Sequence, residues 1–262
     1  MADFDVDLSS LSGIYTLGRG LIYVRDDCDG QDMWLNLGNV VEFNNSLASE
    51  KTDHYQSQGG ARTIDASIVT TLTNTGLITL DNPTARKLAL WFMSEAPTDA
   101  SQASGSLSAQ DFTLNFEHYT NLDYVDLSSI VVEDQTQTTT YVEGVDYVVR
   151  EGGMIAPLQS GSISDGEVVK VTATIPAVTK SKVVSGSQNQ IKRHIKFIGQ
   201  PANGVRQIVQ GYATLAPNGD LAHINETDFQ SFQFNISWER HSDYGGPVEY
   251  FDCGTVSAAA CA

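Results

Sequence analysis

Short runs in which apolar and polar residues alternate dominate the chain, and this pattern predicts β-strands. The clearest run covers residues 62–72, where Ile64, Ile68 and Leu72 share one side of the predicted strand. Near the end of the chain, every second residue from Phe232 to Trp238 is apolar. Further strands are predicted at residues 20–25, 33–43, 112–118, 130–132, 141–149, 154–158, 168–175, 191–198, 205–215 and 229–240. The pattern therefore predicts a mainly β protein.

One segment instead has helical spacing. Asp81 and Asn82 provide a cap, and Pro83 suits the first helical position. Leu88 and Trp91, with the neighbouring Phe92, then form an apolar stripe that is typical of a helix packed on a core. The sequence therefore predicts a single helix that covers a sheet and ends before Pro97.

Three segments lack any periodicity. Residues 44–60 are polar and predict a long loop, which is uncommon inside a compact domain and is usually functional or disordered. Residues 98–108 are rich in Ser, Ala and Gly and predict a mobile loop. The tail from Cys253 to Ala262 consists largely of small residues, so we expect it to be frayed.

The distribution of strands also predicts two domains. Short strands and Gly-containing turns between residues 122 and 175 indicate a self-contained module, and residues 180–190 predict a linker. We therefore expect a core domain of residues 1–121 and 181–262, with a β-sandwich or barrel-like fold and one packed helix. Residues 122–180 then form a small inserted β-rich module, either Ig-like or a hairpin.

Charge is segregated along the chain. The net charge of −17, from 32 acidic and 15 basic residues, argues against a surface that grips nucleic acid. No acidic residue occurs between Val168 and Gly219, although several basic residues do. This stretch either pairs with acidic loops of its own chain or meets an acidic face of another copy. Candidates for such a basic assembly face are Lys192, Arg193, Lys196 and Arg206.

Motifs that carry chemistry are sparse. Residues 27–32 hold carboxylates around Gly30 like a fragment of a calcium loop, but they lack the distal Glu, so a solvated turn is favoured and calcium binding stays open. The five histidines are scattered without metal-ligand spacing. The cysteines, three in number, match no metal spacing either, and we expect reduced thiols. We therefore predict no enzyme, no cofactor and no metal.

Targeting signals are also missing from the pattern. No run of about 18 apolar residues occurs, so no membrane span is expected. The first ten residues carry three aspartates and no basic residue, which is unlike a signal peptide. The sequence thus predicts a protein made in the cytoplasm.

Several strings resemble those of one viral family. Leu37–Phe43, followed by the polar segment and Gly59–Arg62, is similar to the N-terminal region of siphophage major tail tube proteins. Asn82–Leu90 resembles the single helix of that family. Phe197–Leu221, followed by Asp228 and Phe229, resembles its C-terminal strand block. In the predicted insert, strings at 141–147 and 161–166 are similar to a module common in phage structural proteins.

The resemblance implies a structural subunit in the tail of a virion, made in the cytoplasm of a bacterial host. Six copies would form a ring, their sheets would join into a β-barrel around a lumen, and stacked rings would form the conduit for DNA ejection. The implied partners are other copies of the chain and the tape measure, tail terminator and tail tip proteins. DNA would pass without specific binding, and no membrane is involved.

Within this interpretation, the polar segment orders against a neighbouring ring or subunit. Candidate contact residues there are Asn45, Glu50, Asp53, His54 and Tyr55. A lumen wall that carries acidic residues would not adhere to DNA phosphates, and Asp65 is the candidate lumen-facing acid.

Two other classes of function stay open. The first is a phage or cell-surface adhesin that recognises a receptor or glycan through the inserted module. The second is a carbohydrate-active β-sandwich enzyme, because a catalytic carboxylate pair can arise by chance among 32 acidic residues.

Overall fold

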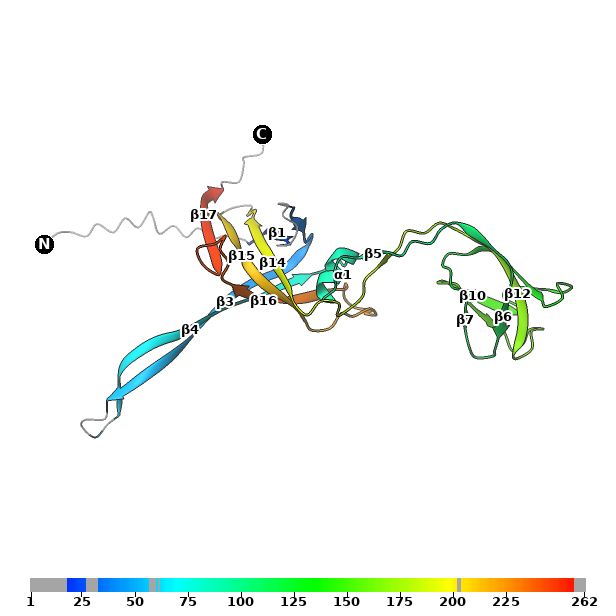
Figure 1. Cartoon of the computed structure of the whole chain (residues 1–262), viewed down its shortest axis with the longest axis horizontal. Coiled ribbons are helices and arrows are strands. Elements are labelled where there is room, and N and C mark those ends of the chain that lie inside the picture. Colours follow the sequence, from blue (N-terminus) through cyan, green and yellow to red (C-terminus); the bar gives the residue numbers. More distant parts are fainter. Residues whose placement is uncertain (1–17, 27–32, 57–59, 61, 202–203, 257–262) are drawn as a thin grey trace. The chain divides into compact units, whose positions relative to one another are not determined.

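The computed structural model describes residues 18–26, 33–56, 60, 62–201 and 204–256. It confirms the mainly β prediction, with antiparallel sheets and one short helix in the described residues. The chain divides into a core unit, residues 1–97 and 183–262, and an inserted unit, residues 98–182 (Figure 1). The predicted calcium-loop fragment lies outside the described residues.

The core unit contains one eight-stranded sheet and the helix α1. Its elements are β1 (Gly20–Arg25), β2 (Leu35–Asn36), β3 (Val40–Gln56), β4 (Thr63–Leu80), α1 (Ala85–Trp91), β14 (Ile191–Gly199), β15 (Gly204–Asn218), β16 (Phe232–Glu239) and β17 (Val248–Val256). The order across the sheet is β2-β1-β14-β15-β16-β4-β3, and β17 pairs with β15 beside β16.

This sheet curls so that its two ends approach each other. The strands β2 and β3 occupy opposite ends of the order, yet only residues 37–39 connect them. Such a connection spans at most about 14 Å. Accordingly, the rings of Phe43 on β3 and Phe197 on β14 lie 5.4 Å apart. The core unit is therefore barrel-like.

The concave side of the sheet holds the hydrophobic core. On β16, alternate side chains from Phe232 to Trp238 are buried, as the sequence pattern predicted. They pack against Ile78 and Leu80 of β4 and against residues of β1, β14 and β15. Fully burying each large aliphatic or aromatic side chain contributes about 1.5–3 kcal/mol.

The helix α1 closes this core, although it is shorter than expected. Its cap position is Thr84 rather than Asp81 or Asn82. The carboxylate of Asp81 instead accepts a hydrogen bond from Asn39 Nδ2 at 2.5 Å. Leu90 enters the core, and Trp91 Nε1 donates to the backbone carbonyl of β16 at residue 233 over 3.1 Å.

The C-terminal tail is also more ordered than expected. Cys253 and the following residues to Val256 belong to β17 and pair with β15, so the prediction of a frayed tail was wrong for this segment. Cys253 is a free, exposed thiol, whereas Cys28 and Cys261 lie outside the described residues.

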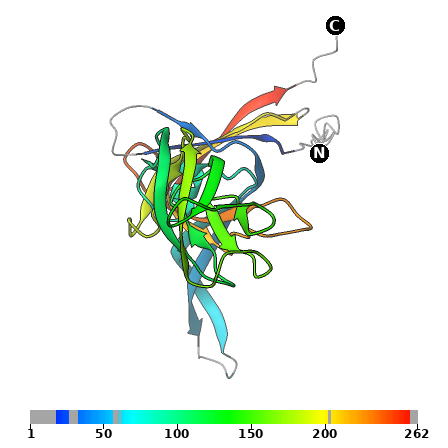
Figure 2. The same ribbon diagram turned by 90° about the vertical axis from the view of Figure 1, so that its right-hand side faces the viewer.

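The inserted unit is a two-layer β-sandwich, shown in green in Figure 2. One sheet has the order β6-β12-β8-β9 and the other β10-β11-β7. Apolar side chains of both sheets, among them Tyr147, Ile155 and Val171, form a core of their own. The strands are β5 (Thr98–Asp99), β6 (Gly105–Leu114), β7 (Thr120–Asn121), β8 (Ser128–Asp134), β9 (Thr140–Tyr141), β10 (Tyr147–Arg150), β11 (Met154–Pro157), β12 (Glu167–Ile175) and β13 (Ser181–Lys182).

The inserted unit begins at residue 98, earlier than the expected residue 122. The segment 98–108 is not simply a loop, because its last residues, from Gly105 on, belong to β6, and β6 pairs with β12 along most of the strand. The short strands β5 and β13 pair with each other and form a double-stranded neck at the start and end of the unit. Gln102 anchors this neck, because its side-chain amide donates to the carbonyls of Val125 and Pro176 at 3.0 and 2.9 Å.

A buried carboxylate organises one turn of the sandwich. Asp146 accepts hydrogen bonds from the backbone amides of Val142 and Ser162, both at 2.8 Å. These bonds favour the ionised form, so the amide of Val142 and then that of Ser162 hold the pKa of Asp146 below its usual value.

This arrangement predicts an acid-sensitive inserted unit. A carboxyl group whose pKa is lowered on folding stabilises the fold above its unfolded pKa of about 3.9, and the contribution is lost as the pH falls through the folded value. Asp146→Asn should therefore lower the free energy of unfolding at pH 7, with a deficit that shrinks below about pH 4. Denaturant titrations at pH 7 and pH 3 measure this, and an equal deficit at both would contradict it.

Candidate functional site

The most unusual feature of the core unit is a two-stranded extension of its sheet. β4 pairs with β16 only as far as Thr75, and beyond that point β3 and β4 pair only with each other. We call residues 47–56 and 63–74 the arm, which is visible as the blue and cyan hairpin in Figure 1. At about 3.3 Å per residue it is about 30 Å long. All its described residues except Asn74 are exposed.

The arm replaces the loop that the sequence predicted for residues 44–60. That prediction was wrong because β3 continues to Gln56 and pairs with β4 almost throughout. Burial normally imposes alternation on a strand, and because most of β3 is exposed on both faces, polar residues interrupt the alternation there. Two bulges in β4 leave Thr70 and Asp65 as extra residues, and each one changes which residues of β4 share a face.

One face of the arm, called its apolar face here, carries most of the large apolar side chains of the arm, interspersed with polar ones such as Lys51 and Asp53. β3 has no extra residue between Phe43 and Tyr55, so alternate residues from Phe43 onward share the face that enters the core at the base. Along this face lie Leu47 and, on the paired strand, Leu72 and Val69. Leu47 and Leu72 are each 65% exposed. The hydrophobic face of the core thus continues along the arm with nothing from the described chain covering it.

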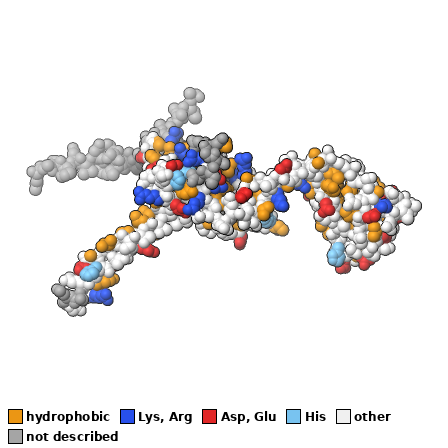
Figure 3. All heavy atoms as spheres, viewed as in Figure 1, with side chains coloured by type: hydrophobic (Ala, Val, Ile, Leu, Met, Phe, Trp, Pro, Cys, Tyr) orange, Lys and Arg blue, Asp and Glu red, His pale blue; other side chains and the backbone are white. Residues whose placement is uncertain are grey.

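The space-filling view agrees with this description. Apolar side chains follow the visible side of the arm, and charged groups and a histidine lie toward its end (Figure 3). A two-stranded hairpin is marginally stable in water by itself. Contiguous exposed apolar surface usually marks an interaction site. The arm therefore has the properties of a segment that packs against another molecule.

The base of the arm is fixed to the core unit. Asn45 accepts a hydrogen bond from Trp238 Nε1 at 3.0 Å, so this predicted contact residue serves within the subunit. At Gly76, a Cβ atom would lie 2.6 Å from the carbonyl oxygen of Asn44. Only glycine therefore allows the close pairing of β3 and β4 where the arm leaves the sheet.

The other predicted contact residues lie along the arm. Glu50, Asp53, His54 and Tyr55 are all exposed on β3. Asp65, the predicted lumen-facing acid, lies at the second bulge, where its carboxylate is 2.6 Å from His54 Nδ1.

The sequence pattern placed Ile64 and Leu72 on one side of the strand, as the structure does, but it missed Leu47 and Val69. It also placed Ile68 on that side, which was wrong because the bulge at Thr70 turns Ile68 to the opposite face. A signal was present in β3, because Phe43, Leu47 and Tyr55 are separated by even numbers of residues. Polar residues between them obscured the period.

A second exposed apolar feature lies between β15 and β16. In the connecting loop, Ile224 is 90% exposed and Phe229 is 93% exposed. The same loop carries Asp220, Glu226 and Asp228. The loop thus combines two apolar side chains with a local excess of negative charge.

The predicted basic face is only partly available. Lys192 and Lys196 alternate with Arg193 along β14, so Arg193 lies on the opposite side of the sheet. Several cations of the acid-free stretch pair within their own chain: Lys170 with Asp111 (2.8 Å), Lys192 with Glu239 (2.5 Å) and Arg193 with Asp26 (2.9 Å). The hydrogen bond from Lys192 lowers the pKa of Glu239. Arg206 on β15 is exposed.

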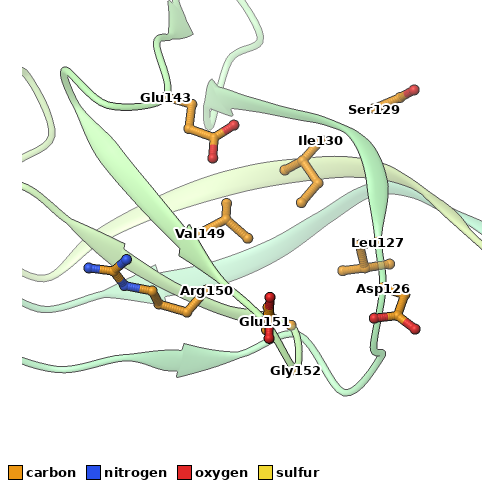
Figure 4. A pocket seen from close by; sticks show the side chains of 10 residues that line it. Asp126, Leu127, Ser129, Ile130, Glu143, Val149, Arg150, Glu151 and Gly152 are labelled. Atoms are coloured by element: carbon orange, nitrogen blue, oxygen red, sulfur yellow. The ribbon is translucent and has the colours of Figure 1, made fainter.

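The inserted unit has a cavity of about 290 Å³. Its apolar lining comes from Leu127, Ile130 and Val149, and its charged lining from Asp126, Glu143, Arg150 and Glu151. Figure 4 shows the carboxylates of Glu143 and Glu151 at opposite ends of the apolar side chains. Asp126 and Ser129 adopt positive φ angles of 57° and 52°, a strained conformation that clusters at ligand sites.

None of the helical residues in the described parts of the chain forms a segment long and apolar enough to cross a bilayer.

No curated protein matches the sequence. A family model matches residues 15–246, which is most of the chain. The protein therefore belongs to the family described as "Protein of unknown function UCP028589".

Proposed function

We propose that the protein is a structural subunit that assembles with copies of itself into the tail tube of a long-tailed bacteriophage. The observation that carries this proposal is the arm, an extension about 30 Å long whose apolar face is left uncovered by its own chain. Another copy of the chain, packed against this face, removes that apolar surface from water. The resemblance to siphophage tail tube proteins supports the same function.

The edges of the sheet support a mode of assembly. The outer edge of the arm in β3 is a long strand edge, and β17 offers another beside β15. Exposed strand edges are templates for pairing with a further chain. Edge pairing between different surfaces of successive copies joins sheets around a closed ring, and a head-to-tail contact between rings gives an open stack. The number of six copies per ring follows from the resemblance alone.

The charge of the subunit fits a conduit for DNA. With a net charge of −17, the protein repels phosphate groups and lets DNA pass without binding. In this proposal Asp65 faces the lumen, and the tape measure, terminator and tip proteins bind the tube. The protein would then reside in the tail of the virion.

Electron microscopy tests the proposal directly. Purified full-length protein, concentrated stepwise and imaged in negative stain, should form rings or hollow tubes of uniform diameter. Size-exclusion chromatography at the same concentrations should show large assemblies. Monomers that persist at every concentration, without rings, would overturn the proposal.

A second candidate function rests on the cavity of the inserted unit. Its apolar floor flanked by carboxylates and Arg150 suits a polyhydroxylated ligand such as a glycan. In this function the inserted unit is an adhesin module that recognises a receptor. Loss of binding to the host surface in a protein that lacks residues 98–182 would favour it.

A further inference from the structure

A buried histidine lies on the face of the sheet opposite the hydrophobic core. On β14, Ile195 enters the core, so the preceding His194 points to the other side. His194 is nonetheless fully buried. The cover comes from residues 240–247, which connect β16 to β17. From this connection, the hydroxyl group of Tyr244 lies 2.9 Å from His194 Nδ1, and the ring of His241 packs against the His194 ring at 4.9 Å.

Three potential ligands meet at this position. One nitrogen of His194, one nitrogen of His241 and one carboxylate oxygen of Asp243 all lie within 4.8 Å of one another. Zinc binds imidazole nitrogen and carboxylate oxygen at about 2.0–2.2 Å, which places tetrahedral ligand atoms about 3.4 Å apart. Small side-chain rotations close this difference, and the half-exposed Asp243 leaves a path for an ion to enter.

The surroundings of the three side chains suit metal binding. A histidine that binds a metal through one nitrogen usually engages a partner with the other, and Tyr244 is in place to be that partner for His194. When His194 Nδ1 donates to this hydroxyl group, the lone pair of the neutral ring lies on Nε2. The guanidinium of Arg25 is 3.6 Å from Asp243 Oδ2, whereas Oδ1 is the carboxylate oxygen that faces His241.

We propose that His194, His241 and Asp243 bind one divalent transition-metal ion, with Zn²⁺ as the best match to two imidazoles and one carboxylate. The ion ties the connection 240–247 to the outer face of β14 and so fixes the start of β17. A fourth position is left for water. This site does not depend on the proposed assembly function.

Metal titration of the full-length protein tests the site. After removal of any affinity tag and treatment with a chelator, isothermal titration with Zn²⁺ should give one ion per chain, and Zn²⁺ should raise the unfolding midpoint. His241→Ala and Asp243→Asn should each weaken binding at least 100-fold and remove the shift in midpoint. Both variants retain His194, so the buried side of the cluster stays filled.

The matched control is His54→Ala, which removes another histidine that lies beside a carboxylate, 2.6 Å from Asp65. It should bind Zn²⁺ as the unchanged protein does. Circular dichroism confirms that each variant is folded. Fewer than one ion per chain, or unchanged affinity in folded His241→Ala and Asp243→Asn, would overturn the proposal.

Discussion

Replacing Leu47 and Leu72 with aspartate should stop the protein from forming tubes while leaving the subunit folded. Both side chains are 65% exposed in the subunit, so their loss changes its own stability by no more than about 0.5 kcal/mol. In an assembly that covers the arm, each leucine contributes about 1.5–3 kcal/mol on burial, and a buried aspartate adds a further cost. Every 1.4 kcal/mol is about a tenfold change in affinity, so association should weaken more than about 100-fold.

The arm also provides a matched control for this experiment. Ala48 and Thr73 are paired across the two strands at the same distance from the body, and they lie on the opposite face. Ala48→Asp with Thr73→Asp adds the same charge, so it should impair assembly much less. Negative-stain images and sedimentation velocity compare the two double variants. Normal tubes from the Leu47 and Leu72 variant would show that this face is not an interface.

Removing the inserted unit should leave a core unit that still folds and assembles. The neck strands β5 and β13 pair Thr98 with Lys182, so the two chain ends at this point are about 5 Å apart. A link of about three Gly or Ser residues can therefore join Pro97 to Val183 without strain. The hydrophobic cores of the two units share no residues, so excision leaves the core of the barrel intact.

This excision also separates the two candidate functions. In the tail tube proposal, the shortened protein forms tubes, as judged by electron microscopy, with an unfolding midpoint close to that of the core unit in the full chain. Soluble but unassembled protein would mean that the inserted unit is part of the assembly contact. Tubes that no longer bind host cells would assign recognition to the inserted unit.

Burial explains much of what could be predicted from the sequence, although the clearest alternation, at residues 62–72, belongs to a strand segment that is exposed on both faces. Strands with one buried face, such as β1 and β16, have clear alternation, and their predicted positions agree closely with the structure. The strand β6 was predicted only from residue 112, because small and polar residues fill its first half. Its pairing with β12 is a contact between distant segments that local pattern cannot reveal.

The candidate sites show the same limit. Four of the five residues predicted for the polar segment lie together on the arm, and Asn45 lies at its base; the segment is a strand, and most of its apolar face was missed. The cluster around His194 was invisible because His194 and His241 are far apart in the sequence and only the sheet brings them together. The single local signal was His241 with Asp243 two residues later, which is too common to indicate a site.

The two bulges of the arm affect when subunits of the proposed tube begin to assemble. A bulge twists a strand and interrupts the flat row of backbone groups to which a second strand could add. Because Thr70 and Asp65 are extra residues, the free edge of β4 cannot form a regular ladder of hydrogen bonds with the same edge of another copy. In the tail tube proposal, the bulges slow unguided pairing along β4, so tube growth should show a lag that a preformed end abolishes.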